Sequence, residues 1–568
     1  MRFTKHSLYL GLSLSLGAVS AGACSASGAA APASSGGPSS GSGDGGSGAG
    51  SDSTGGLGGD DEGFGEGASD PGEPEPGADP KTCAEAVALK SYIGCDFWPT
   101  VTANNVWSIF DYAVVVANAG EEAAEVEVTR GGAAVAHAEI PPNSLSKIYL
   151  PWVRELKGPD MDECSGSVEM TSSVRVNDGA YHLVSTRPVT VYQFNALEYK
   201  GEGGPDGKSW SSCPGNQVCP SDGSPIGCFS FSNDASLLLP STAMTGNYRI
   251  TGKEGWINAE IGGYMTITGT KDGTTVTVQV AEGGRVLAGG GIPVTGGGGI
   301  FSFELGEGDV VEILSHPSSD LSGSLVTATQ PIQVLTGMSC TQSPYGVFAC
   351  DHIEESVFPA ETLGKNYFVT VPTSPGGEVI GHVVRLYGNV DGTVLSYPSG
   401  RPDGAPTTLN AGQVVDLTVV RRDFEIAGDH EFAVSSFMLG AALADPNATV
   451  SQQKGDPSQS LATAVEQYRT KYVFLAPSDY DESYVDIVQP MDASVTLDGE
   501  PVTHQPTRIS SGFGITRVPL GPGNNGAHVL TATAPVGIQV LGYGAYTSYQ
   551  YPGGLNLIAI APPPPPPR

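Results

Sequence analysis

The chain has 568 residues, of which 79 are glycine and 43 are proline, and only 15% are charged, a composition that argues against a mainly helical protein. Its 60 acidic and 27 basic residues give a formal net charge of −33, which would repel nucleic acid and anionic membrane surfaces. Nucleic-acid binding is therefore excluded. The hydrophobic fraction of 39% is enough to form cores in several domains.

The first 23 residues are typical of a secretory signal peptide. Arg2 and Lys5 precede an apolar stretch, 8–19, that is too short to span a membrane, and small residues follow it. Cys24 comes directly after them, as in bacterial lipoprotein signals, although those signals usually have leucine where Ala21 stands. We predict lipidation of Cys24 and anchoring to the bacterial outer membrane or cell surface, with an ordinary signal peptide as the alternative.

Residues 24–82 are predicted to form a disordered tether behind this anchor. They are rich in glycine, serine and acidic residues, and after Cys24 they contain only two large apolar residues, Leu57 and Phe64. Such a segment cannot bury enough apolar surface to offset the entropy of ordering it. A proline-rich tail, 562–568, is expected at the other end. Membrane contact is expected only through the N-terminal lipid.

The cysteines predict disulfides. Without Cys24, eight of the nine cysteines remain, an even number in an exported chain, which allows up to four bridges. Cys340 and Cys350 lie close together and apart from the rest, so we pair them. Cys83 with Cys95 is a further candidate pair. Two more pairs are left open among Cys164, Cys213, Cys219 and Cys228. Zinc is a poor rival because there is no C-x-x-C pair and no histidine at ligand spacing.

From residue 83 onward the pattern predicts an all-β fold. Short β-branched and aromatic runs alternate with Gly, Asp-Gly and Pro turn signals. The clearest runs are 112–117, 124–129, 189–194, 274–280 and 382–387. No stretch sustains helical periodicity over several turns, and only 460–468 indicates a short helix.

An internal repeat organises these strands. Three landmarks recur at an offset of 119 residues: Pro240 and Pro359, Asn247 and Asn366, and Asp272 and Asp391. A weaker copy begins near Lys471, and a more divergent first copy occupies 95–197. Each copy ends in a similar strand, which in three of them includes a proline suited to the start of a strand, at Pro188, Pro331 and Pro535.

A unit of this length is close to a sandwich domain in size and longer than a propeller blade. We therefore predict four tandem β-sandwich-like modules, with a propeller-like arrangement of the same strands as the alternative. The expected modules cover 83–237, 238–357, 358–460 and 461–561, and are called modules 1 to 4 below. The Asp-Gly pairs that begin at Asp272, Asp391 and Asp498 are expected to form tight hairpin turns.

Several segments resemble a known family. The run 321–340, Cys350-Asp-His352 and Phe358-Pro359 are similar to the N-terminal domain of the IgG Fc-binding protein family. The opening 91–98 resembles the version carried by exported proteins of myxobacterium-like bacteria. The resemblance covers roughly residues 90–550. It implies an extracellular binding or adhesion module without known catalysis.

Candidate chemical sites are few. His352 lies beside Cys350 with Asp351, Glu354 and Glu355; a solvated turn next to a disulfide is the expected environment, and a metal-binding or acid/base role is the alternative. Calcium is a minority alternative at two acidic clusters that lack the pattern of an EF-hand. These clusters are Asp160, Asp162 and Glu163, and Asp479, Asp481, Glu482 and Asp486. No catalytic, metal-binding or cofactor-binding residue is assigned, and no cofactor is expected.

The sequence favours a surface-displayed lipoprotein that binds an extracellular protein or glycan, and we expect no enzymatic activity. One alternative is an exported hydrolase whose active site is assembled from distant loops, because catalytic triads are defined by geometry. The other is a structural component of the cell envelope.

Overall fold

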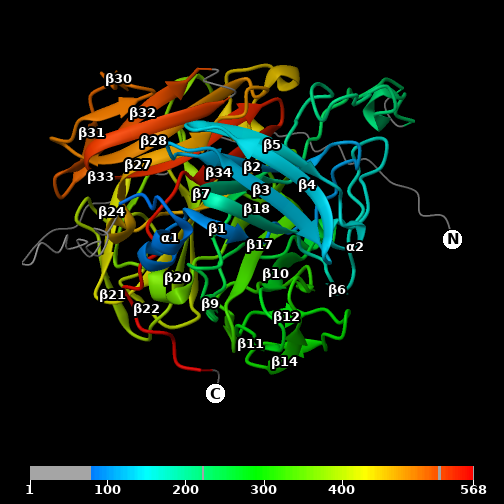
Figure 1. The fold of residues 1–568 in the computed structure, drawn as a ribbon, viewed down its shortest axis with the longest axis horizontal. Helices are drawn as coiled ribbons and strands as arrows, with labels where there is room; N and C mark the ends of the chain where they lie inside the picture. The colour runs from blue at the N-terminus through cyan, green and yellow to red at the C-terminus, as the bar shows by residue number, and fades with distance from the viewer. Residues whose placement is uncertain (1–77, 221–222, 522–525, 567–568) are drawn as a thin grey trace, which may run out of the picture. The chain divides into compact units, whose positions relative to one another are not determined.

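The computed structural model, which describes residues 78–220, 223–521 and 526–566, is built mainly from β-strands joined by turns and loops, and its helices are short (Figure 1). The described residues all fall within one unit, Asp70–Arg568. The predicted all-β fold is confirmed. The predicted signal peptide, Cys24 and nearly all of the predicted tether lie outside the described residues. None of the helices in the described ranges is long and apolar enough to cross a membrane.

Module 1 is organised on the long strand β7. Its elements are α1 (Cys83–Leu89), β1 (Gly94–Phe97), β2 (Tyr112–Asn118), β3 (Ala124–Arg130), β4 (Ala133–Ile140), β5 (Ser144–Leu150), α2 (Arg154–Lys157), β6 (Val174–Val176), β7 (His182–Phe194), the 3-10 helix η1 (Pro214–Asn216) and β8 (Ala235–Leu237). The strand order is β4-β3-β7-β2-β5, and β1 and β8 also pair with β7. Strand β6 instead joins a sheet of module 2.

Module 2 has two main sheets. Its elements are β9 (Asn247–Arg249), η2 (Ile257–Ala259), β10 (Gly263–Gly269), β11 (Thr274–Gln279), β12 (Arg285–Val286), β13 (Thr295–Gly296), β14 (Ile300–Leu305), β15 (Val310–Leu314), β16 (Leu325–Ala328), β17 (Ile332–Thr341) and β18 (Asp351–Ser356). The sheet orders are β18-β17-β10-β15-β6 and β14-β11-β16-β9. An apolar core that includes Met265, Ile267, Val276 and Val326 joins them.

Module 3 repeats this plan. Its elements are η3 (Ala360–Thr362), β19 (Asn366–Val369), η4 (Pro375–Gly377), β20 (His382–Gly388), β21 (Thr393–Ser396), β22 (Thr408–Leu409), β23 (Val414–Val420), β24 (Phe424–Gly428), β25 (Phe432–Phe437), α3 (Ala441–Ala444), η5 (Val450–Gln452) and β26 (Gln459–Leu461). The sheets β19-β24-β21-β22 and β23-β20-β25-β26 share a core that includes Val384, Leu386, Phe424 and Ile426.

Module 4 is organised on β33, as module 1 is on β7. Its elements are η6 (Val465–Gln467), β27 (Arg469–Leu475), β28 (Glu482–Pro490), β29 (Val495–Leu497), β30 (Glu500–Pro501), β31 (Thr507–Ser510), β32 (Phe513–Leu520), β33 (Ala527–Gly544) and β34 (Thr547–Pro552). The order is β30-β29-β33-β28-β32-β31, with β27 and β34 also on β33. The short helix expected at 460–468 is present only as the 3-10 turn η6.

The prolines of the repeat mark where a strand changes partners. Strand β7 pairs with β3 before Pro188 and with β2 after it. Strand β33 pairs with β29 before Pro535 and with β28 after it. Pro331 separates β16 from β17, which belong to the two sheets of module 2. Proline has no N–H, so it fits a crossing point where no ladder bond is needed.

A tyrosine ties the first and last parts of three modules together. The hydroxyls of Tyr248, Tyr367 and Tyr472 each accept a hydrogen bond from the backbone N–H three residues earlier. Each also donates to a backbone carbonyl at the crossing, those of Ile332, Phe432 and Val536 respectively. The tyrosine at this position therefore makes the same pair of hydrogen bonds in each of the three modules.

The prediction for the Asp-Gly turns is correct at one position and wrong at two. Asp498 lies in a hairpin, because β29 and β30 pair across it. At Asp272 and Asp391, however, the flanking strands belong to different sheets. These turns carry the chain across a sandwich, where a glycine with positive φ is still needed, as at Gly273 (φ 68°) and Gly392 (φ 72°).

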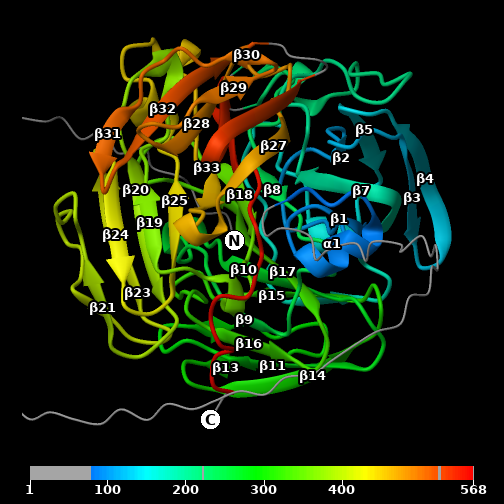
Figure 2. The ribbon, with the colours of Figure 1, turned by 60° about the vertical axis from the view of Figure 1, so that its left-hand side comes forward.

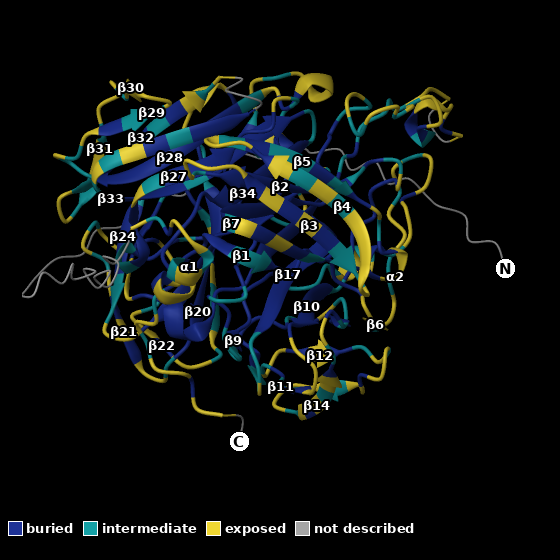
Figure 3. Ribbon diagram, in the orientation of Figure 1, coloured by how far each residue is buried: buried dark blue, intermediate teal, exposed yellow. Residues whose placement is uncertain are grey.

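The last strands of the four modules, β8, β18, β26 and β34, form an inner ring. Strand β8 contacts β18 and β34, and β26 contacts the same two strands, so the ring is closed. Figure 2 shows module 1 in blue to cyan, module 2 in green, module 3 in yellow and module 4 in orange around this centre. The propeller-like alternative therefore describes how the modules are arranged. The inner strands are buried along their length, whereas outer strands such as β4 are largely exposed (Figure 3).

Candidate functional site

Buried polar side chains gather where the inner strands meet, and Asp234 is bonded to three modules. Its carboxylate accepts hydrogen bonds from Ser458 Oγ at 2.6 Å, Ala235 N at 2.9 Å, Gln459 N at 2.9 Å and Glu354 N at 3.1 Å. Asp234 has no exposed surface. Since these donors belong to β8, β18 and the start of β26, this one side chain fixes the relative positions of three inner strands.

Asp351 has the corresponding role at the first residue of β18. Its carboxylate accepts from Asn233 N at 2.6 Å, Thr547 Oγ1 at 3.0 Å and Ser548 N at 3.4 Å. These contacts join module 2 to modules 1 and 4. Asp234 and Asp351 together therefore connect all four modules through hydrogen bonds.

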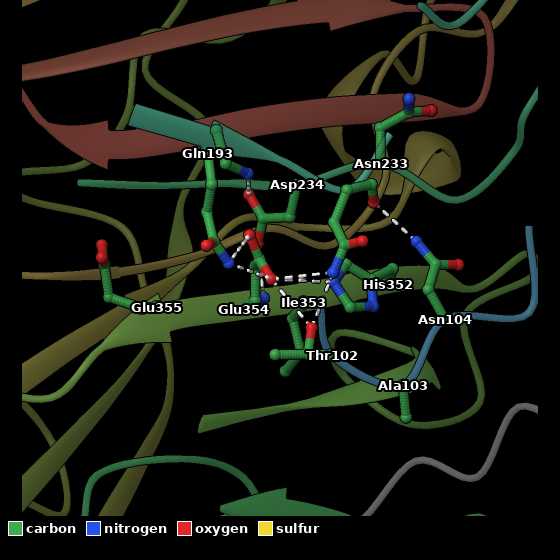
Figure 4. Close-up of polar contacts among 12 residues, drawn as sticks. Thr102, Ala103, Asn104, Gln193, Asn233, Asp234, His352, Ile353, Glu354 and Glu355 are labelled. Carbon is green, nitrogen blue, oxygen red and sulfur yellow. Dashed lines mark hydrogen bonds and ion pairs between the residues drawn. The ribbon is translucent and has the colours of Figure 1, made fainter. Parts of the chain in front are cut away.

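Glu354 faces module 1 from the middle of β18. It accepts from Thr102 Oγ1 at 2.9 Å and Asn195 Nδ2 at 3.0 Å, and Gln193 Nε2 lies 3.3 Å from each of its oxygens. Figure 4 shows Gln193 and Thr102 converging on Glu354, while Glu355 points away from them. Side chains at successive positions of one strand point to opposite faces and thus contact different neighbours.

Burial changes the protonation of these acids. It raises the pKa of Asp234, Asp351, Glu355 and Asp456 well above the usual range for carboxyl groups. The pKa of Asp456 is raised further by the nearby Asp351 carboxylate. Desolvation disfavours the charged form of each group, so the interior of the ring favours neutral acids.

The expectation of a solvated turn at His352 is wrong. His352 and its neighbours Asp351, Glu354 and Glu355 belong to β18 and have no exposed surface. Among the described residues neither ring nitrogen of His352 has a hydrogen-bond partner, and Nε2 lies 3.6 Å from Glu354 Oε2. Polar residues beside a disulfide resemble a surface loop in sequence, but here the closure of the ring buries them.

The described histidines do not form a Ser-His-acid arrangement. Those near a carboxylate oxygen (≤ 4.0 Å) are His137, His182, His352 and His528. Those hydrogen-bonded to a serine hydroxyl are His316 and His382. No histidine in the described ranges belongs to both groups, whereas a triad requires one that does.

The two acidic clusters considered for calcium are engaged with protein groups. Asp160 is 2.7 Å from Lys157 Nζ, and Asp481 is 2.8 Å from Lys200 Nζ. Asp486 accepts from Thr373 at both the backbone N–H and the hydroxyl. Within the described ranges, no group of three or more His, Cys, Asp or Glu residues is placed to hold a metal ion.

The ring ends at a cavity of about 340 Å³. Its lining includes a residue that precedes each inner strand: Phe231, Cys350, Asp456 and Tyr546. All four modules therefore contribute to one concave surface. The cavity is the place in the ring where buried polar groups adjoin exposed loops.

Three of the four disulfides lie in the loops around this cavity. Cys340–Cys350 lines it directly, Cys164–Cys219 holds the loop that bears Ser165 and Ser167, and Cys213–Cys228 holds the loop that bears Ile226. Cys83–Cys95 lies elsewhere, in module 1. Loops held in this way are preorganised for binding.

The comparisons with known proteins agree with this picture. A model of one family, described as IgGFc binding protein, matches residues 234–542. The chain belongs to the IgGFc-binding protein family. The human IgGFc-binding protein is 27% identical over 254 residues, which are 43% of this chain and only 4% of the human protein. A solved structure of an anti-sigma factor domain-containing protein from Clostridium clariflavum is 11% identical, and the match covers 51% of this chain and 81% of that one. The TM-score of this match is 0.11, which is too low to indicate a shared fold.

The family resemblance seen in the sequence is thus confirmed. The IgGFc-binding region contains the inner strands β8, β18 and β26 together with Asp234, Asp351 and Asp456. Strand β34 and nearly all of module 1 lie outside the match. Family membership indicates a binding module.

Sequence reasoning did not identify Asp456 or Tyr546 as members of a site. Both precede the last strand of a repeat, as Asp234 precedes β8. Their positions shortly before these strands are the sequence signal that could have singled them out.

Proposed function

We propose that this member of the IgGFc-binding family is an exported, lipid-anchored module that holds an extracellular protein at the cell surface. The observation that carries the proposal is the end of the ring, where loops from all four modules form one concave surface held by three disulfides. Catalysis does not require such a multi-module surface, whereas a protein partner contacts an area of this kind.

Two further observations support the proposal. The disulfides suit an oxidising, extracellular environment. The net charge of −33 favours a neutral or basic partner and predicts that the electrostatic part of binding weakens as salt concentration rises. The lipid at Cys24 would keep the module at the surface.

The test uses the full chain purified in detergent and immobilised through its C-terminus. Human IgG Fc and fractionated extracellular proteins are passed over it, and assays for ester, peptide and glycoside hydrolysis run in parallel. We expect saturable binding of a protein that is lost when the Cys340–Cys350 bridge is replaced by serines. Turnover of a substrate that disappears on changing one Ser, His or acid, or binding of glycans alone, would reject the proposal.

The anchor is tested separately. Cys24→Ser should move the protein from the membrane fraction to the soluble fraction without changing binding. If the variant stays membrane-bound, the lipid-anchor part of the proposal is wrong.

A further inference from the structure

Asp456 has an unusual environment at the cavity where the ring ends. Its side chain has no exposed surface, and among the described residues neither of its carboxylate oxygens has a hydrogen-bond partner. Its backbone N–H, by contrast, donates to Ser548 Oγ at 2.9 Å. Buried polar groups in proteins are nearly always hydrogen-bonded, because an unmade bond costs the full desolvation of the group. A carboxylate that lines a cavity and has no partner is therefore a position prepared for a ligand.

The other two aspartates of the ring are bonded differently. Asp234 and Asp351 occupy equivalent places in modules 1 and 2, and each accepts at least three hydrogen bonds from neighbouring modules. The fold thus satisfies two of these three aspartates internally. The third faces the cavity.

The remaining lining defines the chemistry of the ligand. Besides Asp456 the lining has the polar side chains of Asn105, Ser165 and Ser167, and among the described residues that line the cavity none is basic. The apolar and aromatic part of the lining includes Met161, Ile226, Phe231, Phe348 and Tyr546. The rings of Phe348 and Tyr546 meet edge to face with centroids 6.2 Å apart. An apolar wall suits a methylene chain, and aromatic faces attract a cation.

The cavity lining combines the buried Asp456 with exposed side chains. Phe348 is 71% exposed, and Ser165 and Ser167 are also exposed. A group that enters between them passes the aromatic side chains before it reaches Asp456. At about 340 Å³ the space is near the lower end of the range for ligand pockets, so it suits a single side chain rather than a large cofactor.

We propose that this cavity receives a lysine or arginine side chain of the protein partner, with its cationic head at Asp456 and its methylene chain packed against Phe348 and Tyr546. The inference rests on the proposed function, because the side chain belongs to the bound protein. A cation beside Asp456 favours the ionised form of the carboxyl group, which burial otherwise disfavours. The acidic surface of the chain draws a basic partner towards the cavity.

Small probes test the cavity independently of any partner. N-acetyl-lysine amide, N-acetyl-arginine amide, the uncharged N-acetyl-norleucine amide and Ca²⁺ are each titrated into the full chain by calorimetry. We expect at least one basic probe to bind about tenfold or more tightly than the norleucine probe. A tenfold difference in affinity corresponds to the usual free energy of a hydrogen bond to a charged group.

Variants then locate the binding. Asp456→Asn should weaken the basic probe by about tenfold or more, a charge-assisted hydrogen bond being lost. The matched control is Glu312→Gln. The carboxyl group of Glu312 is buried, one of its oxygens has no partner among the described residues, and it does not line the cavity. Phe348→Ala should weaken the probe severalfold, with Val394→Ala as the control for loss of an exposed apolar side chain. Phe348 is mostly exposed, so Phe348→Ala is expected to fold. Phe348→Ala therefore tests the inference even if Asp456→Asn does not fold.

Three results would overturn the inference: no binding of either basic probe, basic-probe binding that survives both cavity variants, or binding of Ca²⁺ alone. If a captured protein partner binds Asp456→Asn as well as the parent chain, the inference is wrong and the proposed function stands. If basic probes bind at Asp456 but no protein partner binds the chain, the proposed function fails instead.

Discussion

The interior of each sandwich and the interior of the ring are buried to the same extent but are built from different residues. In module 2 the sandwich interior is apolar, with Met265, Ile267 and Val276 among its members. The ring interior holds Asp234, Asp351 and Glu354, which are also without exposed surface. In module 2 apolar burial holds the two sheets together, whereas at the ring directional hydrogen bonds add to the apolar contacts that join one module to the next.

Strand β10 shows both environments on one element. Met265 and Ile267 belong to the sandwich core. Thr266 and Thr268 point the other way, where Thr266 donates to Glu312 and Thr268 bonds with Thr100 of module 1. Because side chains alternate along a strand, one strand can serve an apolar core and a polar interface. The repeat can thus be copied without every module aggregating through its inner face.

The largest effect should come from the best-connected residue of the ring. Asp234→Ala leaves the donors on Ser458, Gln459 and Glu354 without their acceptor in a buried place, which we expect to cost about 3 to 5 kcal/mol in the free energy of unfolding. Urea denaturation measures it. Ser236→Ala is the matched control, since Ser236 is equally buried on β8 but its hydroxyl has no partner, and its cost should be near zero. Equal costs for the two variants would show that the hydrogen bonds do not stabilise the ring.

The next largest effect on the free energy of unfolding should depend on pH. Burial raises the pKa of Glu312 to about 8, and its Oε1 accepts from Ala103 N at 2.9 Å and Thr266 Oγ1 at 3.0 Å. A carboxyl group with a raised pKa in the folded state stabilises the protein fully below its unfolded pKa. That stability is lost as pH rises towards about 8, by an amount on the order of a few kcal/mol.

Glu312→Gln removes this titration. The fall in unfolding free energy between pH 5 and pH 8 should therefore be shallower in the variant than in the parent chain, as urea denaturation at each pH would show. An unchanged slope would place the pH dependence in other acids, of which Asp486, with its pKa raised by burial to about 6, is the next to test.

The tyrosines of the repeat should give an intermediate effect inside the modules. Tyr248→Phe, Tyr367→Phe and Tyr472→Phe each remove a hydroxyl that joins two backbone groups, at a cost of about 1 to 2 kcal/mol. The three values should agree within about 0.5 kcal/mol if the modules are equivalent. Thermal unfolding compares them. A much larger cost for one tyrosine would show that its module stabilises the others.

The sequence predicted what depends on local pattern. Strands such as 274–280 follow from alternating residues between turn signals, and the repeat follows from landmarks such as Pro240 and Pro359, so the all-β fold and the repeat could be predicted. The sequence predicted the ring only as the propeller-like alternative. Closure of the ring depends on contacts such as that of Asp234 with Ser458, and these two residues are far apart in the chain. The cavity could not be predicted at all, since Phe231 and Tyr546 meet only after four modules have closed.

His352 illustrates why local pattern misleads at the centre. A run of Asp, His and two Glu beside a disulfide has the composition of an exposed turn, and nothing in the run itself shows that other modules cover it. Burial of these residues depends on neighbours such as Thr102 and Gln193, which belong to module 1. Polar residues at module interfaces are thus where expectations from composition fail.

The smallest effect should come from charges on the outside of the ring. Glu122 and Arg187 form an ion pair in module 1 in which 68% of the Glu122 side chain is exposed. In water the attraction is screened and is opposed by the entropy of ordering two long side chains, so Glu122→Ala should cost about 0.5 kcal/mol or less, and less still at high salt. Urea denaturation at low and high salt measures this. A cost above about 1 kcal/mol that persists in salt would contradict the comparison, because charged groups would then stabilise the outer surface as well. The expected outcome sets this exposed pair apart from the acids of the ring interior, where the donors come from other modules and water is excluded.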